Sequence, residues 1–375
     1  MLSTSMSYRL IARDIDTSLA RVANQAAVKR ESDYFRANIG KIKSPEEFVK
    51  NTRLFNYAMK ASGLADMAYA KAFMLKAMKE GVDDPESFAN KLTDKRYAEF
   101  VKTFNFAALG EEATSYNVAR DSTVKSFTDR VTAYGLIEES AEAKAETAYF
   151  KANIGSIQSI DELLGNSRLL TYAMQAFSIE GLGLDHAALT KLLEGGVADP
   201  DSPANAHDDE NVAKFVAAFD FAAMGESTTT HVTAVDDTIA GYLRQTLEEN
   251  AGDQNEGVRL ALYFQRKAST IKSFYSVLSD PALAQVVRTA LGFPDSMAQA
   301  DIDRQVAAME KRIDIEDFQD PEKLAKFLSR FSAMWDVSEA GATTVTSPAL
   351  TILSASTGVG ISSDTLMAIA TLKNR

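Results

Sequence analysis

Residues 34–44 read YFRANIGKIKS, and residues 149–159 read YFKANIGSIQS, 115 positions later. Three further pairs of stretches keep this offset without a gap. They are NTRLFNYAMKA (51–61) with NSRLLTYAMQA (166–176), EGVDDPES (80–87) with GGVADPDS (195–202), and FVKTFNFAALGE (100–111) with FVAAFDFAAMGE (215–226). Because chance agreement would not hold one register over about eighty residues, the chain contains an internal duplication.

A third, more diverged copy follows 114 positions after the second, where residues 263–273 read YFQRKASTIKS. Its end, FLSRFSAMWD at 327–336, restores the spacing of the phenylalanines in the first copy. We therefore expect three tandem copies of one unit: residues 1–116 with an N-terminal helix, residues 117–230, and residues 231–336. Residues 337–375 are rich in Ser, Thr, Gly and Ala, so we expect a flexible tail that ends in a short helix.

The composition predicts an all-α protein, because Ala is abundant while Gly and Pro number only 19 and 8 in 375 residues. Apolar residues at steps of three and four from Ile11 to Ala26 predict one helix that continues past Tyr34 and ends near Gly40. Further helices are predicted over 48–63 and 67–80, and long linking helices over 118–152 and 232–267. We expect hinges in these linkers near Gly135 and at 251–257.

Helix starts are readable from capping residues. Ser44 with Glu47, and Ser159 with Glu162, have the spacing of a capping box. Three Asp-Pro pairs predict the starts of the short helices that carry the phenylalanines: Asp84-Pro85, Asp199-Pro200 and Asp320-Pro321. We expect these phenylalanines to be core residues, with Trp335 anchoring the third group; the alternative is a ligand pocket.

Several classes of protein are disfavoured. The net charge of −12, with scattered basic residues, argues against nucleic acid as a partner. The absence of cysteine excludes disulfides and thiolate chemistry, and no stretch has the roughly 18–20 apolar residues of a membrane span. The first residues do not resemble a cleavable signal peptide. We therefore expect a soluble protein.

The sequence offers no clear catalytic, cofactor or metal site, so we expect a non-enzymatic protein without cofactors. The three histidines lack metal-ligand spacing and are interpreted as surface residues, and nucleotide-binding glycine motifs are missing. Residues 253–257 (DQNEG) only faintly resemble a calcium loop, because the twelfth position is Phe264. Acidic pairs such as Asp236-Asp237 are interpreted as helix caps, with acid–base chemistry as the alternative.

The most site-like polar pair is Asn51 with Arg53, repeated as Asn166 with Arg168. The arginines could hold a partner's carboxylate or bond the carbonyls at a neighbouring helix end, and we favour a structural role. Possible partner contacts are therefore Arg53 and Arg168, together with an apolar strip in the C-terminal helix formed by Leu366, Ile369 and Leu372. Whether that helix packs on the protein's own core or on a partner stays open.

Four stretches carry a family resemblance: SYRLIARDIDTSLARVANQAAVKRESDYF from Ser7, GVRLALYFQRKA from Gly257, SDPALAQVVRTALGFP from Ser279 and DIEDFQDPEKLAKFLSRFSAMWD from Asp314. They resemble an alphaproteobacterial family known only as a domain of unknown function, number 1217. The resemblance covers nearly the whole chain and supplies no catalytic residues. It implies a flagellar context, because members are typically encoded among flagellar genes, an associational argument.

The first hypothesis is thus a non-enzymatic, flagellum-associated structural or assembly protein that contacts partners through helices, including the terminal segments 10–27 and 366–372. The alternative is a cytoplasmic helical-repeat adaptor or export chaperone that binds a protein client. An enzyme with an unfamiliar site is a third possibility. The expected location is the cytoplasm or the flagellum, and the oligomeric state is not predicted.

Overall fold

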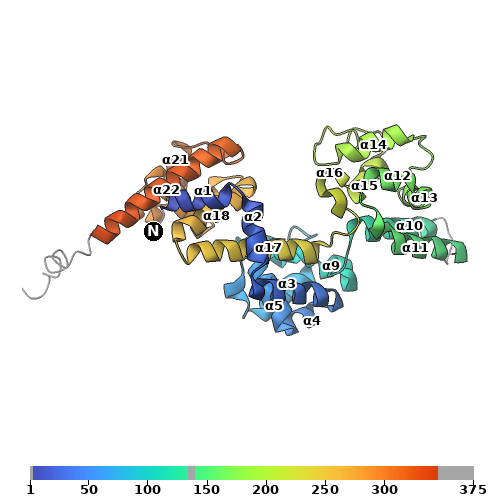
Figure 1. Cartoon of the computed structure of the whole chain (residues 1–375), viewed down its shortest axis with the longest axis horizontal. Helices are drawn as coiled ribbons and strands as arrows, with labels where there is room; N and C mark the ends of the chain where they lie inside the picture. Colours follow the sequence, from blue (N-terminus) through green and yellow to red (C-terminus); the bar gives the residue numbers. More distant parts are fainter. Residues whose placement is uncertain (1–2, 134–139, 345–375) are drawn as a thin grey trace, which may run out of the picture. The chain divides into compact units, whose positions relative to one another are not determined.

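The structure, a computed structural model, describes residues 3–133 and 140–344 (Figure 1). Within these ranges the regular secondary structure consists of α-helices and short 3₁₀ or π turns, with no strand. The all-α prediction is therefore confirmed. The chain divides into two compact units: Val22–Gln245 forms the first, and the described residues before and after it form the second.

The first unit contains the two closest copies, which we call body 1 (residues 26–116) and body 2 (residues 141–231). Their helices follow in the same order at the 115-residue offset, except that two short elements of body 1, η2 and α7, have no helical counterpart in body 2. Body 1 consists of α3 (Ala26–Asn38), η1 (Ile39–Lys41), α4 (Pro45–Lys50), α5 (Thr52–Ala61), η2 (Ala65–Met67), α6 (Lys71–Glu80), α7 (Phe88–Lys91), α8 (Arg96–Thr103), α9 (Phe106–Leu109) and η3 (Gly110–Glu112). Body 2 consists of α11 (Ala141–Asn153), η5 (Ile154–Ser156), α12 (Ile160–Gly165), α13 (Ser167–Ala176), α14 (His186–Gly195), α15 (Glu210–Ala218), α16 (Phe221–Met224) and η6 (Gly225–Ser227).

The third copy, body 3 (residues 256–344), lies in the second unit. It begins, like the other two bodies, with a helix, a 3₁₀ turn, a short helix and a longer helix. It consists of α18 (Glu256–Lys267), η7 (Ala268–Thr270), α19 (Phe274–Leu278), α20 (Pro281–Leu291), η8 (Asp295–Gln299), α21 (Ile302–Glu310), η9 (Ile315–Phe318) and α22 (Pro321–Thr344). The prediction of three diverged copies of one helical unit is confirmed.

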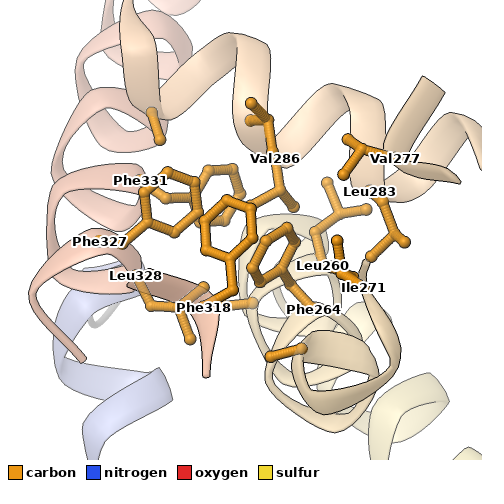
Figure 2. Close-up of a cluster of buried hydrophobic side chains, with 14 of the residues drawn as sticks. Leu260, Phe264, Ile271, Val277, Leu283, Val286, Phe318, Phe327, Leu328 and Phe331 are labelled. Atoms are coloured by element: carbon orange, nitrogen blue, oxygen red, sulfur yellow. The ribbon is translucent and has the colours of Figure 1, made fainter. Parts of the chain in front are cut away.

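Each body has its own apolar core. In bodies 1 and 2 the predicted phenylalanines are buried: Phe100, Phe104 and Phe106, then Phe215, Phe219 and Phe221. Figure 2 shows the third core, where Phe264, Phe318, Phe327 and Phe331 meet aliphatic side chains from α18, α19 and α20. Trp335 packs at its edge and leaves no space for a side chain at Gly257. The interpretation of the Phe groups as core residues is confirmed.

The predicted caps form with one difference. The hydroxyl groups of Ser44 and Ser159 accept the amides of Glu47 and Glu162, each over 3.2 Å. The glutamate carboxylates bond the amides of Lys43 and Gln158, one residue before the cap. The caps therefore start α4 and α12, but the return bond of an ideal capping box goes one residue further back.

The predicted helix over 48–63 is wrong, because it is broken at Asn51. The Asn51 side chain accepts the amide of Leu54 and starts a new helix, α5, and Asn166 does the same for α13. The predicted helix over 67–80 begins instead at Lys71. Asp320-Pro321 starts α22 as predicted, whereas Asp84-Pro85 and Asp199-Pro200 lie in turns, where each Asp accepts an amide two residues on.

The predicted helix from Ile11 to Gly40 is also wrong. The segment forms three helices, α1 (Thr4–Ala12), α2 (Ile15–Ala23) and α3. Asp14 interrupts the first two, because its carboxylate accepts the amide of Thr17 at the start of α2. At the other end, α22 continues to Thr344, so residues 337–344 are helical rather than part of a flexible tail.

The linker before body 2 contains a π turn, η4 (Val118–Ser122), followed by α10 (Thr123–Ala133). The linker before body 3 contains α17 (Thr233–Gly252). The expected hinge near Gly135 lies outside the described residues. At 251–257 the structure has a tight turn: Asn255 accepts the amide of Val258 and so caps α18. Among the described residues, no helix combines the length and apolar character needed to cross a membrane.

Candidate functional site

The repeated arginines form the same clamp in bodies 1 and 2. Arg53 meets Glu31 of α3 through two hydrogen bonds of 2.8 and 3.1 Å, and its guanidinium lies 3.5 Å from the centre of the Tyr34 ring. Arg168 meets Glu146 through two bonds of 2.9 Å and lies 3.5 Å from the Tyr149 ring. Such bidentate pairs tie α5 to α3 and α13 to α11.

Each clamp lowers the pKa of its glutamate, because the hydrogen bond from arginine favours the charged carboxylate. The hypothesis that the arginines bond carbonyls at a helix end is wrong for the observed geometry, because their partners are carboxylates of the same body. Partner binding by Arg53 and Arg168 stays a prediction. Both side chains are about half exposed, and two open hollows of ≈ 490 and ≈ 660 Å³ flank Arg168.

Body 3 is built without the clamp. Leu260 and Ala282 occupy the positions of the glutamate and the arginine. Asp280 replaces the capping asparagine: it accepts the amides of Ala282 and Leu283 and also the Tyr263 hydroxyl, at 2.5 Å. The helix start is thus retained in all three bodies while the clamp is not, so the cap is the more basic structural requirement of the unit.

Few ionisable groups are buried. Among the described residues Glu248 is the one fully buried carboxylate, and Arg266 neutralises it through bonds of 2.7 and 2.8 Å. His231 is not a surface histidine: it is mostly buried and lies 3.1 Å from Asp237. Burial raises the pKa of Asp237. Within residues 3–133 and 140–344, no group of His, Asp and Glu side chains could hold a metal ion.

The second unit presents exposed apolar side chains on its terminal helices. The α1 and α22 helices run antiparallel, because the Thr4 amide bonds the Asp336 carboxylate at 2.9 Å and Arg9 bonds the Ser329 hydroxyl at 2.8 Å. Met6 and Leu10, 54% and 51% exposed, lie one turn apart on α1. We call these two residues the α1 strip. They lie on the side of α1 opposite the buried Thr4 and Tyr8.

The α22 helix reaches beyond the pairing with α1 (Figure 1). Val337 follows directly after Asp336 and is 68% exposed. Sequence periodicity predicted an amphipathic N-terminal segment at 10–27, and its contact with a partner stays a prediction. It did not predict the exposure of Met6 or the pairing of α1 with α22. The other predicted contacts, Leu366, Ile369 and Leu372, lie outside the described residues.

Comparisons with known proteins agree with the repeat. The model of the family described as "Protein of unknown function (DUF1217)" matches residues 61–182 and again residues 176–324. A crystal structure of protein AGR_C_984 from Agrobacterium tumefaciens is 35% identical and superposes with a TM-score of 0.54, covering 90% of this chain and 97% of that one. No curated protein matches. The chain belongs to the DUF1217 family of proteins of unknown function.

Proposed function

We propose that this chain is a non-enzymatic, flagellum-associated structural or assembly protein that acts through helix-mediated contacts with other proteins. The observation that carries the proposal is the antiparallel pairing of α1 with α22, which joins the two ends of the described chain in one helical pair. The pair exposes the α1 strip and Val337. Its expected partner is an amphipathic helix of another protein, with apolar residues three or four positions apart.

The energetics of this surface suit a protein contact. Met6 and Leu10 are about half exposed, so their complete burial in a contact contributes about half of the 1.5–3 kcal/mol of a fully exposed side chain, or about 0.8–1.5 kcal/mol each. A strip of this size supports a weak contact alone, so a stable complex requires further surface. The C-terminal segment containing Leu366, Ile369 and Leu372 is the natural source of that additional surface.

The flagellar assignment is supported by the gene context that the family resemblance implies, which is an association and not a physical argument. It is tested by deleting the gene in the strain that carries it and restoring a tagged copy. Lost swimming, with the restored protein in the sheared filament or hook fraction, is the expected result. Lost swimming with strictly cytoplasmic protein would favour the adaptor or chaperone, and unchanged swimming would contradict a flagellar role.

The contribution of the C-terminal segment is tested by truncation after Ser347. If the segment contacts a partner, the truncated protein fails to restore swimming while its thermal unfolding stays nearly unchanged. A large fall in melting temperature would show instead that the segment belongs to the protein's own core. The melting temperature of the second unit can be measured by the fluorescence of the single tryptophan, Trp335, which packs on the core of body 3.

A further inference from the structure

Bodies 1 and 2 each hold a stack of three aromatic rings at equivalent positions. In body 2 the ring centres of Phe150 and Tyr172 are 4.5 Å apart, and those of Tyr172 and Phe127 are 4.3 Å apart. Phe127 comes from α10, the helix that immediately precedes body 2 in the sequence. The middle ring is held by a hydrogen bond of 3.0 Å between Thr147 and the Tyr172 hydroxyl. An aromatic residue of the preceding helix thus completes the core of body 2.

Body 1 has the same stack, but its outer ring comes from a distant segment. Phe35 and Tyr57 are 4.5 Å apart, and Tyr57 and Tyr242 are 3.9 Å apart, with a bond of 2.8 Å between Ser32 and the Tyr57 hydroxyl. Each of these residues lies 115 positions from its counterpart in body 2. Tyr242 belongs to α17, the helix that precedes body 3, so body 1 takes the helix that its position in the chain would assign to body 3.

The helix that precedes body 1 cannot fill this role. Ala12 stands where Phe127 and Tyr242 stand in the other two lead segments, and it has no ring to stack. In the structure α1 packs instead on body 3, through Thr4 with Asp336 and Arg9 with Ser329. The contacts of α17 with body 1 are therefore determined by side-chain complementarity, because sequence proximity would have placed a different helix there.

Other contacts attach α17 to body 1. Arg36 of α3 pairs with Asp236 at 2.9 Å, and Lys60 lies 5.1 Å from the centre of the Tyr242 ring. Gly241 lies so close to the end of α5 that a Cβ atom there would be 2.8 Å from the Ala61 carbonyl oxygen. The Arg36–Asp236 pair is partly exposed to solvent, so both positions are accessible to a chemical probe.

We propose that body 1 and α17 form a transferable pair of docking surface and helix, and that two copies of this chain can exchange α17. Within one chain the helix competes with an effective concentration on the order of millimolar. Exchange is therefore expected in only about one chain in a hundred at 10 µM and in about a third at 500 µM. This inference is independent of the proposed function, because it concerns a different surface.

Site-directed cross-linking tests the exchange, and the absence of native cysteine makes it free of background. One full-length variant carries Arg36→Cys and another carries Asp236→Cys. They are unfolded together in urea, refolded as a mixture at both concentrations, and treated with a short bis-maleimide. The matched control replaces Arg36→Cys by Lys29→Cys, a similarly exposed position of α3 about 10 Å further along the helix. A chain carrying both Arg36→Cys and Asp236→Cys reports, by internal cross-linking, that the interface forms.

The expected result is a cross-linked dimer for the Arg36→Cys and Asp236→Cys mixture, with a yield that rises with concentration, and little or none for the control mixture. The double variant should give a cross-linked monomer at low concentration. Cross-linked dimer that is absent at both concentrations, or equally abundant in the control, would overturn the proposal. Failure of the double variant to cross-link internally would contradict the contact between α17 and body 1 itself.

Discussion

Replacing Tyr242 by alanine should destabilise the first unit by about 3 kcal/mol. The ring is partly buried against body 1 and is stacked on Tyr57 with an angle of 12° between the ring planes. An aromatic side chain buries about 150–250 Å², so loss of roughly half of this area removes about 2.5 kcal/mol at about 25 cal/mol/Å². The stack adds about 1 kcal/mol, and the better helix propensity of alanine returns about 0.5 kcal/mol.

The matched substitution is Tyr242→Phe, which recreates the ring found at Phe127 in body 2. Because the stack is retained, its effect on the free energy of unfolding should stay within about 0.5 kcal/mol. Phe127→Ala provides a replicate in body 2 and should cost as much as Tyr242→Ala. Urea unfolding followed by circular dichroism measures the total change, and hydrogen exchange assigns it to α5 or α13. Equal losses for Tyr242→Phe and Tyr242→Ala, or no loss for either, would refute the role assigned to the stack.

Three other perturbations have defined outcomes. Gly241→Leu should destabilise the first unit by about 1–3 kcal/mol, measured by urea unfolding, because its side chain meets backbone that cannot rotate away. Gly257→Val should shift the fluorescence of Trp335 and lower the melting temperature of the second unit, because a Cβ atom there would lie 2.5 Å from the indole. The hydrogen bond from Arg53 lowers the pKa of Glu31, so this bond stabilises the fold above the ordinary carboxyl pKa of 4.5. The stabilisation is lost as the pH falls through the lower pKa of the folded state. Arg53→Met should therefore make the free energy of unfolding depend less on pH on the acid side, as measured by urea unfolding at a series of pH values.

The repeat and the three cores could be predicted from sequence, because both depend on patterns within one copy. The phenylalanine spacing and the Ser44 and Ser159 caps are local signals that tertiary packing did not override. Helix breaks were harder to predict. Apolar periodicity continues across Asp14 and across Asn51, although both side chains accept backbone amides and begin new helices. Their preference for the N-cap position was the available signal.

Contacts between distant segments could not be predicted from apolar periodicity. Some of them can be predicted by comparing the three copies with one another. Glu31 and Arg53 recur as Glu146 and Arg168, and body 3 loses both members of the pair together. This joint loss predicts that the two positions touch. Likewise, positions 127 and 242 both carry an aromatic residue, which is consistent with equivalent roles for α10 and α17. It could not indicate that α17 packs on body 1.

The proposed function depends most directly on the α1 strip, which is expected to contact a partner protein. A deletion strain is complemented with Met6→Glu/Leu10→Glu, and with Tyr69→Glu as the control, because Tyr69 is 80% exposed and lies far from α1 in the sequence. Swimming speed is compared between strains that contain equal amounts of each variant, after the melting temperature of each variant is shown to equal that of the unmodified protein. The double variant is expected to fail to restore swimming, while the control restores it fully. Full swimming with the double variant would contradict the claim that this protein acts through the exposed face of α1.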